Sequence, residues 1–222
     1  MNYQRNAEFA TRRSEVVSSI AETRISAIIR SDDQQLAREA MSAAVEGGFR
    51  MIEFTLTTPG ALELVAEFSK KPELIVGAGT VMTPEAVRNA VSAGACFIVS
   101  PIFDASVVAE AARLDVASIP GAFTPTEMER AHRAGADFVK VFPAPPGGVD
   151  YIHAIRGPLP HLKLFPTAGI TPDNFHEWLN AGCVGVGFVR SLFDPAELST
   201  RNFRSIRERA AMIHRRLASL QT

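Results

Sequence analysis

The chain has 222 residues, of which 46% are hydrophobic and 21% charged, so it can bury a full core as one domain. Its 23 basic and 24 acidic residues leave a formal charge of −1, which gives no electrostatic reason to expect a nucleic-acid or anionic-membrane partner. No apolar run reaches the roughly 20 residues that a membrane helix needs, and the polar start MNYQRNAEFATRRSEVVSSI is unlike a secretory signal. We therefore expect a cytoplasmic protein.

The cysteines and lysines carry separate information. Cys96 and Cys183 lie in apolar surroundings far apart in the sequence, which is typical of buried thiols in a reducing compartment rather than of a disulfide framework or a zinc site. Of the four lysines, two lie in the polar segment SKKPE, where solvent exposure is the ordinary outcome. Lys140 and Lys163 stand alone in apolar runs, and their charge needs another explanation.

Eight short apolar runs recur along the chain, each followed by a turn and a helical pattern. They span residues 26–29, 51–55, 74–78, 97–100, 117–119, 138–142, 162–165 and 184–187. Their lengths suit parallel strands that are covered on both faces. Eight strand-and-helix alternations predict an α/β fold, a (β/α)8 TIM barrel. A doubly wound open sheet is the alternative, but it normally has fewer strands and lacks this regular spacing of about 22 to 25 residues.

Local signals mark the helices between these runs. N-cap threonines precede a proline at the first helical position at Thr83, Thr124 and Thr171. Glycines end helices just before the next strand at Gly47, Gly94, Gly135 and Gly182. We expect a single domain over residues 1–222, with an extra N-terminal helix within 1–20, the barrel over 25–193 and a C-terminal helix over 195–218.

The active site of such a barrel lies at the carboxyl ends of its strands. The candidates for chemistry are therefore the residues that close each strand: Arg30, Glu53, Thr55, Gly79, Thr80, Ser100, Pro101, Pro120, Gly121, Lys140, Phe142, Thr167, Ala168, Gly169, Gly187, Phe188, Val189 and Arg190. This set contains no histidine and no pair of carboxylates suited to a metal, so we expect neither a metal nor another cofactor.

Lys140 lies in DFVKVFPA, where apolar and aromatic neighbours would desolvate its ammonium group and lower its pKa. A neutral amine can form a Schiff base with a ketone, and the imine then accepts the electrons released when an adjacent C–C bond breaks. This is the chemistry of a class I aldolase. The alternative is a lysine that pairs with a carboxylate inside the barrel. Lys163, in HLKLFPT, has the same K-x-F-P spacing, so spacing alone leaves both lysines open.

Glu53 and two arginines complete the candidate chemistry. Glu53 lies amid apolar residues in MIEFTLTTP, where a raised pKa would suit a proton shuttle for Schiff-base chemistry. The alternative is an internal ion pair with Lys140 or Arg30. Arg30 and Arg190 follow the first and last strands, which become neighbours when the barrel closes. Either suits an anionic substrate, and surface ion pairs are the alternative.

Two segments of small residues stand where a strand meets a helix, GAGT at 77–80 and TAGIT at 167–171. Backbone N–H groups at such positions can hold a carboxylate or a phosphate, helped by the helix dipole. Tight turns of a barrel require small residues as well, so this signal is weak without further evidence.

Six segments together resemble the bacterial 2-keto-3-deoxy-6-phosphogluconate aldolase and 4-hydroxy-2-oxoglutarate aldolase family: IEFTLTTP, VGAGTVMTPE, AGACFIVSP, IPGAFTPTE, GADFVKVFPA and PTAGITPDN. They occur in order between about Ile25 and Phe193. The resemblance implies a (β/α)8 barrel assembled as a homotrimer, without a metal, that cleaves a 2-keto-4-hydroxy acid to pyruvate and an aldehyde. It also implies that Lys140 is the nucleophile and Lys163 is not, because KVFPA resembles the family's Schiff-base segment.

The same resemblance assigns roles to further residues. It implies that Glu53 is the acid/base, that Thr80 and Pro101 hold the pyruvate half, that Phe142 packs beside it and that Thr167 lines the pocket. The chain departs from the family pattern at Thr57, where arginine is frequent, at Ile102 and Ala168, where glycine is frequent, and at Phe188 or Val189, where a phosphate-binding serine is usual. These departures weaken the expected phosphate site, and Arg30 or Arg190 could supply the charge instead.

The sequence therefore predicts a class I aldolase that cleaves a 2-keto-3-deoxy-6-phospho sugar acid to pyruvate and glyceraldehyde 3-phosphate. A 4-hydroxy-2-oxoglutarate aldolase with oxaloacetate decarboxylase activity is the alternative, and the departures favour it slightly. A noncatalytic sugar-acid-binding barrel is a further alternative, but the joint presence of Lys140 and Glu53 argues against it. A phosphate-binding barrel isomerase would leave Lys140 unexplained. The expected partners are a small-molecule 2-keto acid and further copies of the chain.

Overall fold

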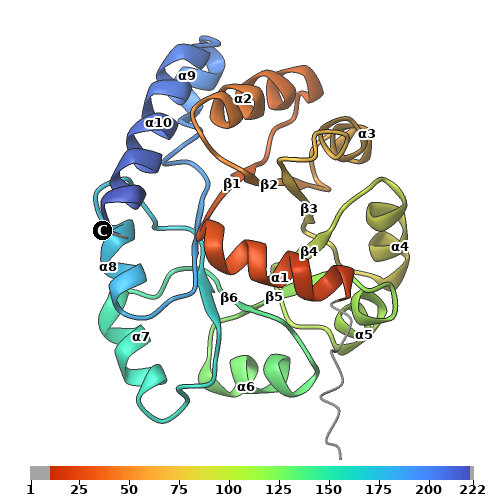
Figure 1. Cartoon of the computed structure of the whole chain (residues 1–222), viewed down its shortest axis with the longest axis vertical. Helices are drawn as coiled ribbons and strands as arrows, with labels where there is room; N and C mark the ends of the chain where they lie inside the picture. Colours follow the sequence, from red (N-terminus) through yellow and green to blue (C-terminus); the bar gives the residue numbers. More distant parts are fainter. Residues whose placement is uncertain (1–10, 221–222) are drawn as a thin grey trace, which may run out of the picture.

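The computed structural model describes residues 11–220, and eight parallel strands alternate with helices in this part of the chain (Figure 1). The strands are β1 Ile25–Ile29, β2 Met51–Thr55, β3 Ile75–Gly79, β4 Phe97–Ser100, β5 Ala117–Ala122, β6 Val139–Val141, β7 Leu164–Pro166 and β8 Val186–Phe188. They pair in the order β7-β6-β5-β4-β3-β2-β1-β8, and a bridge between Thr167 and Gly187 joins the two ends. The predicted (β/α)8 barrel is confirmed.

The helices are α1 Arg12–Thr23, α2 Gln34–Glu46, α3 Ala61–Phe68, α4 Pro84–Ser92, α5 Ala105–Arg113, α6 Pro125–Arg133, α7 Gly148–Arg156, α8 Phe175–Asn180, α9 Pro195–Ser199 and α10 Phe203–Ser219. The caps predicted at Thr83 and Thr124 are confirmed. The cap predicted at Thr171 is wrong, because α8 begins only at Phe175. The backbone N–H of Thr171 donates to Asn174 Oδ1 at 2.8 Å, and this closes a separate turn before the helix.

Three of the four glycines predicted to end helices do so with a left-handed backbone, and at the fourth site the neighbouring glycine takes this role. Gly94, Gly135 and Gly182 follow their helices with positive φ, as expected. After α2 the left-handed residue is Gly48, at φ 111°, whereas Gly47 keeps φ −77°. Gly47 is needed for packing instead, since a methyl group there would come within 2.4 Å of the Cβ of Ala210 in α10.

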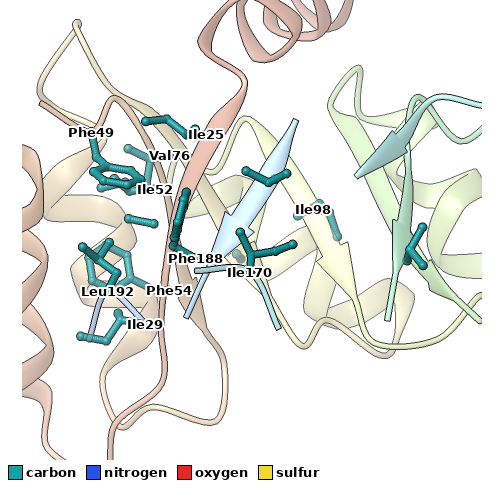
Figure 2. Packing of buried hydrophobic residues seen from close by; sticks show 14 of the residues in the cluster. Ile25, Ile29, Phe49, Ile52, Phe54, Val76, Ile98, Ile170, Phe188 and Leu192 are labelled. Atoms are coloured by element: carbon teal, nitrogen blue, oxygen red, sulfur yellow. The ribbon is translucent and has the colours of Figure 1, made fainter. Parts of the chain in front are cut away.

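Successive strand residues face opposite sides, either outward to the helices or inward to the barrel axis. The outward side chains form the larger core, which includes Ile52, Phe54 and Phe188 (Figure 2). The inward cluster consists of Met51, Phe97, Val99, Ala117, Ile119, Phe138 and Phe165, with Ile20 from α1. The barrel interior is therefore filled by side chains.

Helix α1 lies across the barrel (Figure 1) and closes the amino end of the strands. Its Ile20 is fully buried in the inward cluster. Arg13 Nε lies 3.0 Å from both carboxylate oxygens of Asp137, and Arg13 Nη2 donates to the carbonyl of Gly135 at 2.6 Å. An N-terminal helix was expected over 1–20; α1 runs from Arg12 to Thr23, three residues past that end, and residues 1–10 lie outside the described residues.

The single C-terminal helix expected over 195–218 is wrong. The segment forms two helices, α9 and α10, with a break between them. Arg201 in the break has φ 53°, a left-handed conformation that a helix cannot contain. Asn202 then caps α10 by accepting a hydrogen bond from the N–H of Ser205.

Two further expectations concern single residues and the membrane. Cys96 and Cys183 are free thiols, the first half-buried and the second buried. Within residues 11–220, every helix is too short or too polar to cross a membrane.

Candidate active site

A cavity of about 600 Å³ opens at the carboxyl ends of the strands. Most of the predicted site residues line it: Arg30, Glu53, Thr55, Thr80, Pro101, Lys140, Phe142, Thr167, Ala168, Val189 and Arg190. The candidates outside its lining are Gly79, Ser100, Pro120, Gly121, Gly187, Phe188 and Gly169. Gly169 follows the lining residue Ala168 in the sequence. It is exposed, and its carbonyl accepts a hydrogen bond from Asn174 Nδ2 at 3.0 Å, so it shapes the turn beside the cavity.

Lys140 is the central residue of β6. Its neighbours Val139 and Val141 face the outer core, so alternation turns the lysine inward. The side chain is only 8% exposed, and Nζ lies 4.8 Å from the ring centroid of Phe142. Burial lowers the pKa of Lys140, the carboxylate of Glu53 opposes this shift, and Arg30 adds to the lowering. The net shift increases the fraction of neutral, nucleophilic amine.

Lys163 lies elsewhere. It immediately precedes β7, is exposed, and places Nζ 5.9 Å from the ring centroid of Phe138. In the β6–β7 pair Lys140 is opposite Phe165, so Lys163 is level with the start of β6, towards the amino end of the barrel. The structure therefore separates two lysines that share the same local sequence pattern.

Glu53 lies on β2 and is 2% exposed. Its carboxylate occupies space above Gly79 of the neighbouring strand β3. Burial raises the pKa of Glu53, while the charges of Lys140 and then Arg30 lower it. Within residues 11–220 no salt bridge joins Glu53 to Lys140 or Arg30, but both cations attract its carboxylate, which is compatible with a proton-shuttle role. A buried carboxyl of raised pKa beside an amine of lowered pKa suits proton exchange between the two.

Arg30 reaches across the end of β2. Its Nη2 donates to Thr80 Oγ1, 3.3 Å away at the end of β3. Thr80 has φ 59°, which a non-glycine residue rarely adopts and which is often found at functional sites. Arg190 lines the same cavity from the end of β8. Neither arginine forms an ion pair with a carboxylate in residues 11–220, so both charges remain available to a ligand.

Three threonines support the loop that carries Arg30. Thr55 Oγ1 lies 3.0 Å from Thr57 Oγ1 and 3.4 Å from Thr58 Oγ1. The hydroxyl of Thr58 accepts a hydrogen bond from the N–H of Ser31 at 3.2 Å. This chain of hydroxyl groups ties the loop after β1 to the end of β2.

On the other side of the cavity, Thr167 is buried, and Ala168 and Gly169 both have positive φ, 68° and 84°. Other lining residues were not predicted as site residues: Ile28, Ser31, Asp32, Leu36, Phe193, Pro195, Leu198 and Ser199. Most of them lie beyond the last residue of β1 or β8, in the following loops and helices. The sequence carried no clear signal for them, because the expected C-terminal helix over 195–218 left only a short connection after the last strand.

The model of the KDPG and KHG aldolase family matches residues 16–208. A 2-dehydro-3-deoxy-6-phosphogalactonate aldolase of Escherichia coli (strain K12) is 33% identical over 172 residues, which cover 75% of this chain and 83% of that protein. The structure of KDPG aldolase from Legionella pneumophila, with pyruvate captured as a covalent carbinolamine intermediate, is 27% identical with a TM-score of 0.81, and the match covers 89% of this chain and 97% of that one.

A third match is a cube-shaped protein cage designed by fusing symmetric oligomeric domains. It is 29% identical with a TM-score of 0.79, covering 89% of this chain and 73% of that one.

Proposed function

This chain belongs to the KDPG and KHG aldolase family and is therefore a carbon–carbon lyase, and we propose that it cleaves a 2-keto-3-deoxy-6-phospho sugar acid through a Schiff base on Lys140. The products are pyruvate and glyceraldehyde 3-phosphate. The observation that carries this proposal is the buried amine of Lys140, which opens into the cavity together with the buried carboxyl of Glu53.

The reaction begins when the neutral amine of Lys140 attacks the C2 carbonyl of the substrate to form a carbinolamine. Glu53 protonates the departing hydroxyl group, water leaves, and the iminium ion results. Glu53 then removes the proton of the C4 hydroxyl, and the C3–C4 bond breaks. Its electron pair moves into the iminium group, which gives an enamine and releases the aldehyde. Protonation at C3 and hydrolysis of the imine free pyruvate and regenerate Lys140.

The remaining residues divide between the two halves of the substrate. We assign the pyruvate half to Thr80, Pro101 and Phe142, with Arg30 close enough to bind its carboxylate. We assign the distal half of the substrate to Arg190 and to the segment Thr167, Ala168 and Gly169. The backbone N–H groups of this segment suit an anion.

A second candidate substrate is 4-hydroxy-2-oxoglutarate, with oxaloacetate decarboxylated through the same imine. Val189 favours it, because this residue lines the cavity and provides no hydroxyl group for a phosphate. Arg190 would bind the terminal carboxylate of such a substrate. The two candidates differ only in the distal half and share the chemistry of Lys140.

Intact-mass spectrometry after incubation with pyruvate and borohydride tests the mechanism. We expect a pyruvate adduct on the wild type and on Lys163→Ala, and none on Lys140→Ala. No adduct on the wild type, or an adduct that persists without Lys140, would overturn the assignment. Cleavage rates for the phosphorylated sugar acid and for 4-hydroxy-2-oxoglutarate then distinguish the two candidate substrates.

We also propose that the enzyme is a homotrimer, supported by its likeness to a cage built from symmetric oligomeric domains. Sedimentation equilibrium checks this, and a species of one or two chains would contradict it. The cytoplasmic location stays a prediction, which fractionation of cells tests.

A further inference from the structure

The cavity has an apolar side that the chemistry of Lys140 does not use. Five residues form it, and we call them the distal wall: Leu36, Val189, Phe193, Pro195 and Leu198. Phe193 is buried, whereas Leu36, Val189 and Leu198 are half-buried and keep surface towards the cavity. Their own side chains offer no hydrogen bond to the hydroxyl groups of a sugar acid, whereas Ser31, Asp32, Arg190 and Ser199 line the cavity from the same segments and can provide one.

Ion pairs hold the two helices that carry this wall. Arg209 of α10 donates to both carboxylate oxygens of Glu197 in α9, at 2.8 and 2.6 Å, and to the carbonyl of Leu192 at 2.8 Å. Arg201, just after α9, lies 2.6 Å from Glu39 of α2 and 3.5 Å from Asp33. Figure 1 shows α9, α10 and α2 side by side at one edge of the barrel.

Because these contacts fix α9 against α2 and α10, the distal wall is formed before a ligand binds. An apolar ligand group that contacts it therefore gains the free energy of leaving water without first ordering a loop. The cavity of about 600 Å³ is within the range that holds drug-sized ligands and is far larger than pyruvate requires.

We propose that the enzyme also joins pyruvate to unphosphorylated aldehydes that carry an apolar chain, and cleaves the corresponding 2-keto-4-hydroxy acids. This rests on the proposed Schiff base at Lys140. The pyruvate enamine attacks the aldehyde carbon through C3, the new C–C bond takes the enamine electron pair, and the aldehyde oxygen receives a proton from Glu53. Water then hydrolyses the imine, so the step needs no oxidant or reductant.

Initial rates of condensation with pyruvate and ethanal, butanal or hexanal test the proposal. Burying one methylene group corresponds to about a fourfold gain in kcat/KM, so we expect a rise of about that factor per methylene along the series. Leu198→Ser should flatten this dependence. Leu220→Ser, at an exposed position at the end of α10 and outside the cavity, is the matched control and should keep it.

The outcomes separate the two proposals. A wild type that traps pyruvate but shows no gain with chain length would overturn the distal-wall proposal and leave the Schiff base standing. A wild type that traps no pyruvate would overturn both. A chain-length dependence that Leu198→Ser leaves intact would also overturn the role of the wall. If that variant does not fold, Leu36→Ser provides the same test from α2.

Discussion

The carboxylate of Glu53 occupies the space that a side chain at Gly79 would take on the neighbouring strand. A methyl group built at Gly79 would come within 1.8 Å of Glu53 Oε1. Gly79 is paired with Thr55 of β2, two residues beyond Glu53, so the backbone cannot withdraw without breaking the sheet. The position of the proposed proton shuttle, Glu53, therefore depends on the absence of a side chain at Gly79 of β3.

Gly79→Ala should lower kcat by about a hundredfold, because it displaces the Glu53 carboxyl by an ångström or more. The pyruvate KM should change less, since the substitution leaves Lys140 in place. Gly157→Ala is the matched control: Gly157 has φ −53°, and a methyl group there would lie 3.7 Å from the carbonyl of His153. Steady-state kinetics of both variants check this, and equal kcat values would show that Glu53 tolerates displacement.

The pH dependence of Schiff-base formation should shift in opposite directions in two variants. Burial lowers the pKa of Lys140, Glu53 raises it and Arg30 lowers it. Arg30→Gln removes a lowering charge, so the midpoint of the acid limb should move to higher pH. Glu53→Gln removes the raising charge, so the midpoint should move to lower pH. Timed trapping of pyruvate with cyanoborohydride, followed by intact mass, measures both midpoints; a shift of the same sign would refute the electrostatic account.

Much of the barrel could be predicted because its strands are buried on both faces and read as apolar runs. The runs at 51–55 and 97–100 match β2 and β4 in full. The largest error at a single strand end is at β5, which extends to Ala122 rather than ending at residue 119. Proline and glycine usually end a strand, but Pro120 pairs with Ser100 and Gly121 with Lys140. Pairing with two neighbours outweighs the local preference.

The site could be predicted only in part. Residues that close a strand could be placed in the cavity because all parallel strands end on one face. The choice between Lys140 and Lys163 could not be made from spacing, since it depends on the register of β6 against β7. Apart from Val189, the residues of the distal wall were missed because they follow β1 and β8 at irregular distances. The break at Arg201, which sets the position of α9, has no periodic signal.

Replacing both buried ionisable groups should stabilise the fold while abolishing activity. The pKa of Glu53 is higher in the folded protein than its unfolded value of 4.5. The free energy of unfolding therefore falls as pH rises from 4.5 towards the pKa of Glu53 in the folded protein. The pKa of Lys140 is lower in the folded protein than its unfolded value of 10.5. The free energy of unfolding therefore rises as pH rises from the pKa of Lys140 in the folded protein towards 10.5. The two slopes have opposite signs, and at pH 7 both groups cost stability.

The double variant Glu53→Gln/Lys140→Met should therefore gain about 1–4 kcal/mol in the free energy of unfolding at pH 7. Urea unfolding followed by circular dichroism measures this quantity. A double variant less stable than the wild type would indicate that attraction between Glu53 and Lys140 exceeds their desolvation cost.

Ala168→Gly should stabilise the protein by about 0.5–1 kcal/mol. Ala168 has φ 68°, and relief of this left-handed conformation outweighs the extra chain entropy of glycine in the unfolded state. Ala134→Gly is the matched control and should destabilise, because Ala134 at the end of α6 has φ −75°. Thermal unfolding of both variants provides the comparison, and a lower Tm for Ala168→Gly would mean that its methyl group makes compensating contacts.

Arg13→Ala should destabilise the fold by about 1–2 kcal/mol and leave kcat unchanged. The substitution removes the contacts of Arg13 with Asp137 and Gly135, which attach α1 to the amino end of the barrel. The cavity with Lys140 lies at the opposite end. Arg133→Ala is the matched control. It removes an ion pair with Glu129 in which the arginine is exposed, so the free energy of unfolding should change by less than about 0.5 kcal/mol. Urea unfolding and kcat are measured on both variants, and a fall in kcat for Arg13→Ala at full folding would show that the two ends of the barrel are coupled.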